Sequence, residues 1–188
     1  MKRLFVVAVA ISAANAYADN VVGNASLLVS PDQGPGFSQF EVNDEGGELV
    51  AVSGAQVNLQ KQSGGYKGFA FGRPFNMSCS ATQCTDSGST QLNLTVTPID
   101  TGYKLSGTLN FVSVDASVTD SKISMSVMGF NSNTSFELDR RSNGGYSGDG
   151  NSDALRTFSA TLSTSGTLSG LKDPASFIVL VVSPFVRR

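Results

Sequence analysis

The feature that most restricts the fold of this chain is a period of two in its apolar residues. Leu92, Leu94 and Val96 alternate with polar residues, and the same alternation recurs along most of the sequence. Successive side chains of a β-strand point to opposite sides, so each run predicts a strand with one buried face. The clearest runs cover residues 55–60, 75–80, 91–97, 123–127, 135–139 and 158–163.

Clusters of turn-forming residues separate these runs. Glycine, asparagine, aspartate and serine gather at 63–65, 100–102, 131–133 and 143–145, at the spacing expected of hairpin connections. The chain therefore predicts an all-β protein, either an antiparallel sandwich or a closed barrel of about ten short strands.

Two segments depart from the simple alternation. The apolar set shifts by one position near Phe111–Val112, which predicts a β-bulge or a break in the strand. The run Phe177–Val182 is uninterrupted and rich in β-branched residues, which favours a core strand buried on both faces. Asp173 and Pro174 would also suit the start of a short capping helix, and this is the alternative.

The first 18 residues have the features of a secretory signal peptide. Lys2 and Arg3 precede an apolar stretch at 4–11, and small residues near 16–18 offer a cleavage site. The apolar stretch is shorter than the roughly 20 residues that a spanning helix needs. We therefore expect a signal peptide at 1–18, one domain at 19–188, and export to the periplasm or the medium. The alternative destination is the outer membrane.

The charge of the expected mature chain argues against nucleic acid as a partner. Without residues 1–18, the chain has 11 basic and 15 acidic side chains, which gives a net charge of −4. Binding to a phosphate backbone needs a basic patch, which this balance does not supply. Carbohydrate, an apolar ligand or another protein remain as candidate partners, and the sequence leaves the oligomeric state open.

The chain has two cysteines, Cys79 and Cys84, with four residues between them. An even pair in an exported protein predicts a disulfide. Across a short hairpin loop their Cα atoms would lie within the range that a disulfide bridges.

The chain contains no histidine, which excludes several classes of enzyme. Nucleophiles activated by histidine, HExxH zinc sites and imidazole proton transfer are all ruled out. Ser169 and Lys172 have the spacing of a serine–lysine hydrolase motif but lack its companion motifs. We therefore expect no enzymatic activity, and a hydrolase without histidine ranks last among the alternatives.

Asp149, Asn151 and Asp153 place three oxygen-bearing side chains at alternate positions, in a segment expected to be a loop. Calcium prefers oxygen ligands, and this spacing occurs in calcium-binding loops, although the rest of an EF-hand is missing. A calcium site and an ordinary polar turn both remain open, and no other cofactor is expected.

Three of the four tyrosines, Tyr66, Tyr103 and Tyr146, directly follow glycine turns. In a simple meander Tyr66 and Tyr103 would lie at one end of the sheet and Tyr146 at the other. The favoured interpretation is aromatic cover over the turns. The alternative is a ligand-binding platform for sugars at Tyr66 and Tyr103.

These observations predict an exported, non-catalytic β-domain with a structural, surface or binding role. A small outer-membrane β-barrel is the alternative from another class, because its strands would also alternate.

Overall fold

The computed structural model describes residues 23–31, 38–45, 48–51, 58–62, 64–70, 73–89, 91–129, 133–153, 156–182 and 185. The expected signal peptide lies outside the described residues.

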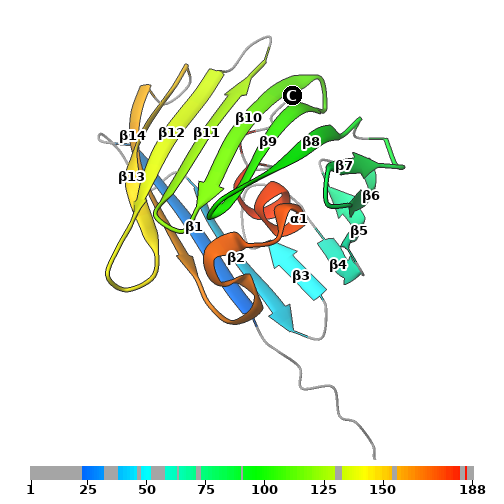
Figure 1. Ribbon diagram of the computed structural model, residues 1–188, viewed down its shortest axis with the longest axis horizontal. Helices are drawn as coiled ribbons and strands as arrows, with labels where there is room; N and C mark the ends of the chain where they lie inside the picture. The colour runs from blue at the N-terminus through cyan, green and yellow to red at the C-terminus, as the bar shows by residue number, and fades with distance from the viewer. Residues whose placement is uncertain are drawn as a thin grey trace, which may run out of the picture.

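Fourteen antiparallel strands in the described part of the chain form a closed barrel (Figure 1). Each strand pairs with the next along the chain, and β1 also pairs with β14, so the ladder runs full circle. The strands are β1 (Gly23–Pro31), β2 (Ser38–Glu45), β3 (Glu48–Ala51), β4 (Asn58–Gln62), β5 (Gly65–Ala70), β6 (Arg73–Cys79), β7 (Gln83–Asp86), β8 (Asn93–Ile99), β9 (Gly102–Leu109), β10 (Val112–Thr119), β11 (Lys122–Met128), β12 (Asn133–Arg140), β13 (Tyr146–Ser152) and β14 (Arg156–Thr164).

The all-β prediction is therefore confirmed, in its barrel form. The fourteen strands exceed the ten or so that the sequence predicts. Part of the difference is that β3 and β7 have only four residues each. Such short strands carry too few alternating positions to stand out in the sequence.

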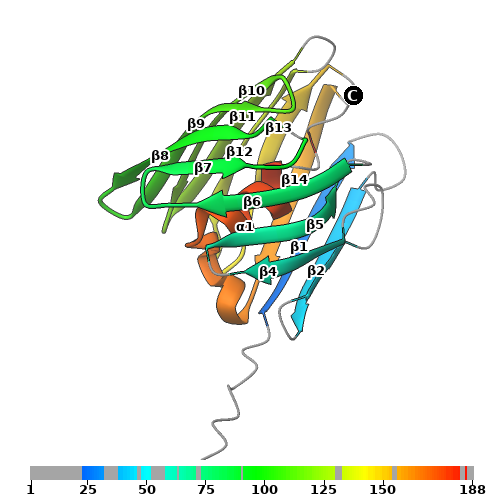
Figure 2. The same ribbon diagram turned by 90° about the vertical axis from the view of Figure 1, so that its right-hand side faces the viewer.

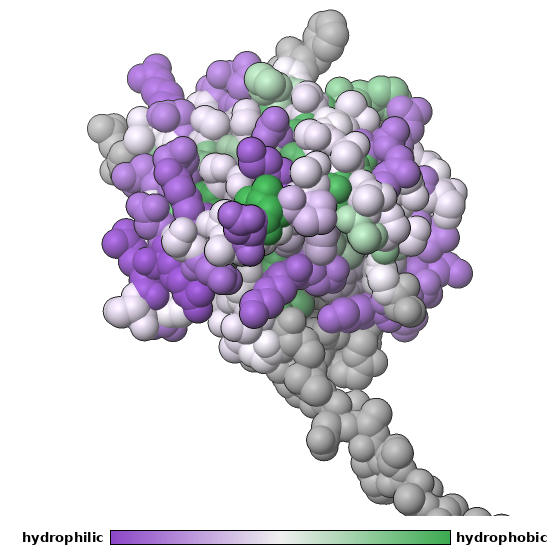
Figure 3. Space-filling view, in the orientation of Figure 1, coloured by the Kyte–Doolittle hydropathy of each residue, from purple (hydrophilic) through white to green (hydrophobic). Residues whose placement is uncertain are grey.

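The alternation places apolar side chains inside the barrel and polar ones outside. In β8, Leu94 and Val96 are buried, whereas Asn93, Thr95 and Thr97 are exposed. The surface seen in Figure 3 is accordingly mostly hydrophilic, with small apolar patches. Among the described residues, none of the helices has the length and apolar character that a bilayer crossing requires.

The shift of phase near Phe111–Val112 is a tight hairpin between β9 and β10. Leu109 pairs with Val112, and the two residues between them, Asn110 and Phe111, have φ values of 51° and 69°. Two successive positive φ values are typical of a type I′ turn, whose twist matches that of the strands. The predicted break is confirmed, and the bulge that was its alternative is absent from this hairpin.

The disulfide between Cys79 and Cys84 is also confirmed. The two residues are directly paired on β6 and β7, with their Cα atoms 4.0 Å apart. The bond closes the hairpin loop between the strands, and the described residues contain no free cysteine.

The prediction of a core strand at Phe177–Val182 is wrong, and the helical alternative is the better one. After a 3₁₀ segment, η1 (Gly166–Leu171), the chain forms α1 (Pro174–Phe177) and a π-helical turn, η2 (Ile178–Val182). In Figures 1 and 2 this segment lies inside the barrel, with strands on both sides of it.

Closure of the barrel explains why β-branched residues adopt a helix here. A closed barrel has no free edge with which an inner strand could pair. A helix satisfies most of its own backbone groups, so it can be buried without a partner strand. Asp173 also starts the helix, because its carboxylate accepts hydrogen bonds from the backbone N–H groups of Ala175 and Ser176.

The segment that we call the plug, residues 174–182, fills the barrel. Every side chain from Ala175 to Val182 is buried. The ring of Phe177 packs edge-on against Tyr103, with 6.3 Å between ring centroids. Phe136 and Phe158 pack together elsewhere in the interior, also edge-on. The plug therefore completes an apolar core that the strands alone would leave hollow.

Candidate functional site

All three glycine–tyrosine junctions lie at one end of the barrel, which we call the tyrosine end. Tyr66, Tyr103 and Tyr146 are at the starts of β5, β9 and β13. Alternate strands of an antiparallel meander run the same way, so these starts share an end. The expectation that Tyr146 lies at the opposite end is wrong, because the β9–β10 hairpin adds a strand between Tyr103 and Tyr146.

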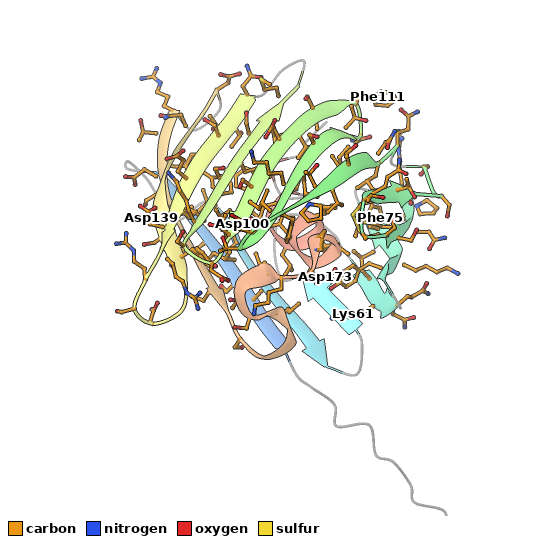
Figure 4. The ribbon with its side chains drawn as sticks, viewed as in Figure 1. Lys61, Phe75, Asp100, Phe111, Asp139 and Asp173 are labelled. Atoms are coloured by element: carbon orange, nitrogen blue, oxygen red, sulfur yellow. A yellow bond between two sulfur atoms is a disulfide. The ribbon has the colours of Figure 1, made fainter. Side chains whose placement is uncertain are left out.

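The tyrosine hydroxyls bind the chain as it enters the barrel. The Tyr66 hydroxyl lies 2.7 Å from Ser176 Oγ, and Ser176 Oγ donates to Asp173 Oδ2 at 2.8 Å. The Tyr103 hydroxyl donates to the carbonyl of Leu171 at 2.7 Å. Tyr66 and Tyr103 are thus connected to both sides of the turn that starts the plug, where Figure 4 places Asp173.

Burial raises the pKa of Tyr103 well above its ordinary value, because the charged phenolate would lose its hydration. The negative charges of the Asp173 carboxylate and of an ionised Tyr146 hydroxyl raise the pKa of Tyr103 further. Burial likewise raises the pKa of Tyr146, whose hydroxyl donates to the carbonyl of Thr119. The hydroxyls of Tyr103 and Tyr146 therefore act as neutral hydrogen-bond donors in the folded protein.

The burial of Tyr66 and Tyr103 makes them inaccessible to a sugar in the folded protein. Their exposed fractions are 0% and 6%, and their rings face the barrel interior. A sugar could reach them only after the plug had left. The contacts at the tyrosine end thus hold the plug, and a sugar platform at Tyr66 and Tyr103 stays a prediction.

Asp149, Asn151 and Asp153 do not form the loop expected of a calcium site. Asp149 and Asn151 are outward positions of β13, and Asp153 follows its end. Alternate residues of a strand are about 6.7 Å apart, whereas a binding loop curls around its ion. Asn151 Oδ1 accepts a hydrogen bond from Thr157, and Asp153 Oδ2 accepts one from the Asn133 N–H.

No group of three acidic or cysteine side chains suited to a metal ion occurs among the described residues. The premise of a loop was wrong, and calcium at this strand stays a prediction.

The same strand forms part of a polar outer face. Register aligns outward side chains of β10 to β14 into two neighbouring rows that cross the strands. The first row is Asp115, Ser126, Ser135, Asn151 and Thr157, and the second is Ser117, Ser124, Glu137, Asp149 and Ser159. Outward Thr and Ser side chains also occur elsewhere, but here they face hollows in the surface.

Two adjoining hollows lie on this face. One, of about 420 Å³, spans β10 to β13, and the other, of about 430 Å³, spans β11 to β14. They share the side chains of Ser126, Ser135 and Asn151. We call the two hollows together the polar groove. Its remaining polar side chains are Asp115, Ser124, Asn133, Thr134, Glu137, Asp149, Ser152, Asp153, Arg156 and Thr157.

Carboxylates and two cations, Lys122 and Arg156, set the charge of the groove. Glu137 and Asp149 are directly opposite on β12 and β13, a placement that is unfavourable for two like charges. Lys122 compensates, because its Nζ lies 2.6 Å from Glu137 Oε2. The hydrogen bond to Glu137 is the largest cause of the raised pKa of Lys122.

The sequence indicated one strand of the groove, β13, and missed the other four. The alternate spacing of Asp149, Asn151 and Asp153 predicted a binding role. Ser124, Ser126 and Ser135 have the spacing of ordinary outward strand residues. The recurrence of serine at outward positions of the neighbouring runs 123–127 and 135–139 was the available signal. Its meaning depends on the register between strands, which the sequence does not specify.

No protein-family model, curated protein or solved structure matches this chain. The polar groove is therefore the candidate functional site of this chain.

Proposed function

We propose that this is an exported, non-catalytic binding protein whose polar groove takes a hydroxyl-rich ligand. The observation that carries the proposal is the pair of adjoining hollows on β10–β14, lined by hydroxyl, amide and carboxylate groups together with Met125, Met128 and Phe136. Serine hydroxyls and asparagine amides donate and accept hydrogen bonds, whereas carboxylates accept them. Carbohydrates need this combination, because each of their hydroxyls also donates and accepts.

Export is supported by the disulfide as well as by the N-terminal sequence. Disulfides persist in oxidising compartments, such as the periplasm and the extracellular space. The Cys79–Cys84 bond closes a hairpin whose loop, residues 80–83, is exposed, although Cys84 itself is buried.

The outward side chains favour an aqueous setting over the alternative of a membrane barrel. Membrane barrels turn apolar side chains toward lipid. In β12 the outward residues are instead Asn133, Ser135, Glu137 and Asp139, and the inward ones are apolar apart from Thr134.

A binding role fits the carboxylates better than catalysis does. Glu137 and Asp149 are adjacent, as in some glycosidases, but a general acid needs a carboxyl group in apolar surroundings. The Glu137 side chain is 67% exposed and is paired with Lys122.

Fractionation of expressing cells tests export. We expect the mature protein, beginning at Asp19, in the periplasm or the medium, with any membrane-associated fraction released by carbonate. Carbonate-resistant protein that needs detergent would favour the outer-membrane alternative instead.

Binding is tested with the mature protein and a panel of soluble neutral, basic and acidic oligosaccharides, followed by calorimetry. Ser135→Tyr fills the centre of the groove and should weaken binding at least about tenfold, since tyrosine suits an outward strand position. Thr95→Tyr, at an exposed position of β8 outside the groove, is the matched control and should bind normally. Binding that survives Ser135→Tyr would place the site elsewhere, and cleavage of a bound oligosaccharide would refute a non-catalytic role.

A further inference from the structure

We propose that the ligand is an extended neutral glycan that lies across the strands, with about one sugar ring to each strand from β10 to β14. The inference rests on the proposed function and goes further by stating the ligand's shape, its orientation and its charge.

The register of the strands supports a ligand that crosses them. In the first row, Asp115, Ser126, Ser135, Asn151 and Thr157 are paired in succession from β10 to β14. Strands about 4.8 Å apart make this row about 19 Å long, whereas the two rows are only about 6.7 Å apart along the strands. The groove is therefore longer across the strands than along them.

The two hollows are continuous along this direction. The first extends from β10 to β13 and the second from β11 to β14, and both include Ser126, Ser135 and Asn151. A compact ligand would occupy one hollow, whereas a chain of sugar rings would occupy both. In Figure 1 these strands form one continuous wall of the barrel.

Serine lines the floor of the groove, although it also occupies exposed outward positions elsewhere, such as Ser78 and Ser106. β8 carries Thr95 and Thr97 at exposed outward positions, and threonine favours strands more than serine does. The floor of the groove instead carries Ser124, Ser126 and Ser135, whose small side chains leave the surface hollow. None of the three makes a side-chain hydrogen bond within the described part of the chain, so their hydroxyls are free to bind a ligand.

The charge of the groove selects among glycans. Asp115, Asp149 and Asp153 outnumber Arg156, since Glu137 is paired with Lys122. Carboxylates accept hydrogen bonds from sugar hydroxyls but repel sulfate and uronate groups. A neutral glycan satisfies the groove without that repulsion.

A length series of the neutral glycan that binds in the panel tests the inference. From disaccharide to hexasaccharide, affinity should rise by at least about tenfold and then level off near five rings. Thr157→Tyr, at the β14 end of the first row, should weaken only the longer oligomers. Ser135→Tyr, at its centre, should weaken all of them.

The possible results separate the inference from the proposed function. Equal affinity for a disaccharide and a hexasaccharide would overturn the extended orientation and leave the binding role standing. Preferential binding of an acidic glycan would overturn the neutral class. Absence of binding to any glycan in the panel would overturn both proposals.

Discussion

The tyrosine end and the polar groove are built from similar polar residues but differ in how those residues are paired. At the tyrosine end, the hydroxyls of Tyr66, Tyr103 and Ser176 each have a partner within 2.8 Å. In the groove, the side-chain hydroxyls of Ser124 and Ser126 have no hydrogen-bond partner in the described part of the chain.

Burial explains the difference. A buried polar group without a partner costs free energy, and the described residues contain no buried side-chain atom of this kind. An outward hydroxyl can bind water at no such cost, so it need not be paired for the protein to fold. Polar residues inside the barrel therefore contribute to stability, whereas those in the groove remain available to a ligand.

The largest effect is expected in the plug. Phe177→Ala removes a fully buried ring that packs against Tyr103 and should lower the free energy of unfolding by about 3–5 kcal/mol. Urea denaturation measures the change. Phe111→Ala is the control, because this ring is 73% exposed and, as Figure 4 shows, lies at the far end of β9 from Asp100. Equal losses in the two variants would contradict a core role for the plug.

A smaller effect is expected from the disulfide near the tyrosine end. Replacing both Cys79 and Cys84 by alanine should cost about 2 kcal/mol, because the bond closes a very short loop. Thermal or urea denaturation of the oxidised protein and the double variant measures the difference. Labelling of the unreduced protein should detect no free thiol, and two labelled thiols would contradict the bond.

Removing one hydroxyl from the tyrosine end should have a still smaller effect. Tyr66→Phe loses the contact with Ser176 and should cost about 0.5–1.5 kcal/mol. In a double-mutant cycle with Ser176→Ala, the two losses should sum to more than the loss in the double variant. Strictly additive losses would mean that the two hydroxyls do not interact. Ser126→Ala, in the groove, should change stability by less than about 0.5 kcal/mol.

The smallest expected effect is on the pH dependence of stability, to which the tyrosine end contributes through Tyr103. The pKa of Tyr103 is raised in the folded state, so folding favours the protonated phenol. Its contribution is complete below the ordinary pKa of about 10 and is lost as pH rises above that value toward the folded pKa. Tyr103→Phe should therefore flatten the decline in unfolding free energy above about pH 10. An unchanged alkaline decline would show that other groups cause it.

Local patterns in the sequence were sufficient for the strands and their buried faces. Alternation identified the inward positions of β8 and β11, and the spacing of Cys79 and Cys84 identified their hairpin. The error over Tyr146 shows where local patterns fail. Treating Tyr103–Val118 as one bent strand, in place of two joined by a hairpin, reverses the direction of every later strand.

The plug and the groove could not be derived in this way, for two different reasons. The run Phe177–Val182 has the composition of a strand, and only closure of the barrel leaves it no edge to join. The groove depends on which polar side chains lie opposite one another across five strands, and that is set by the register of each hairpin.

Closure through β1 and β14 also has a consequence for the order of folding. Thirteen of the fourteen ladders join neighbours in the sequence, whereas the contact of Ser30 with Ser159 joins residues 129 positions apart. Loop-closure entropy makes the pairing of such distant residues slow. One edge of β1 therefore stays unpaired while the hairpins form. An unpaired edge invites association with other chains, so aggregation should be most severe before the ring is sealed. Pulsed hydrogen exchange during refolding should find the amides between β1 and β14 protected later than those between β10 and β11.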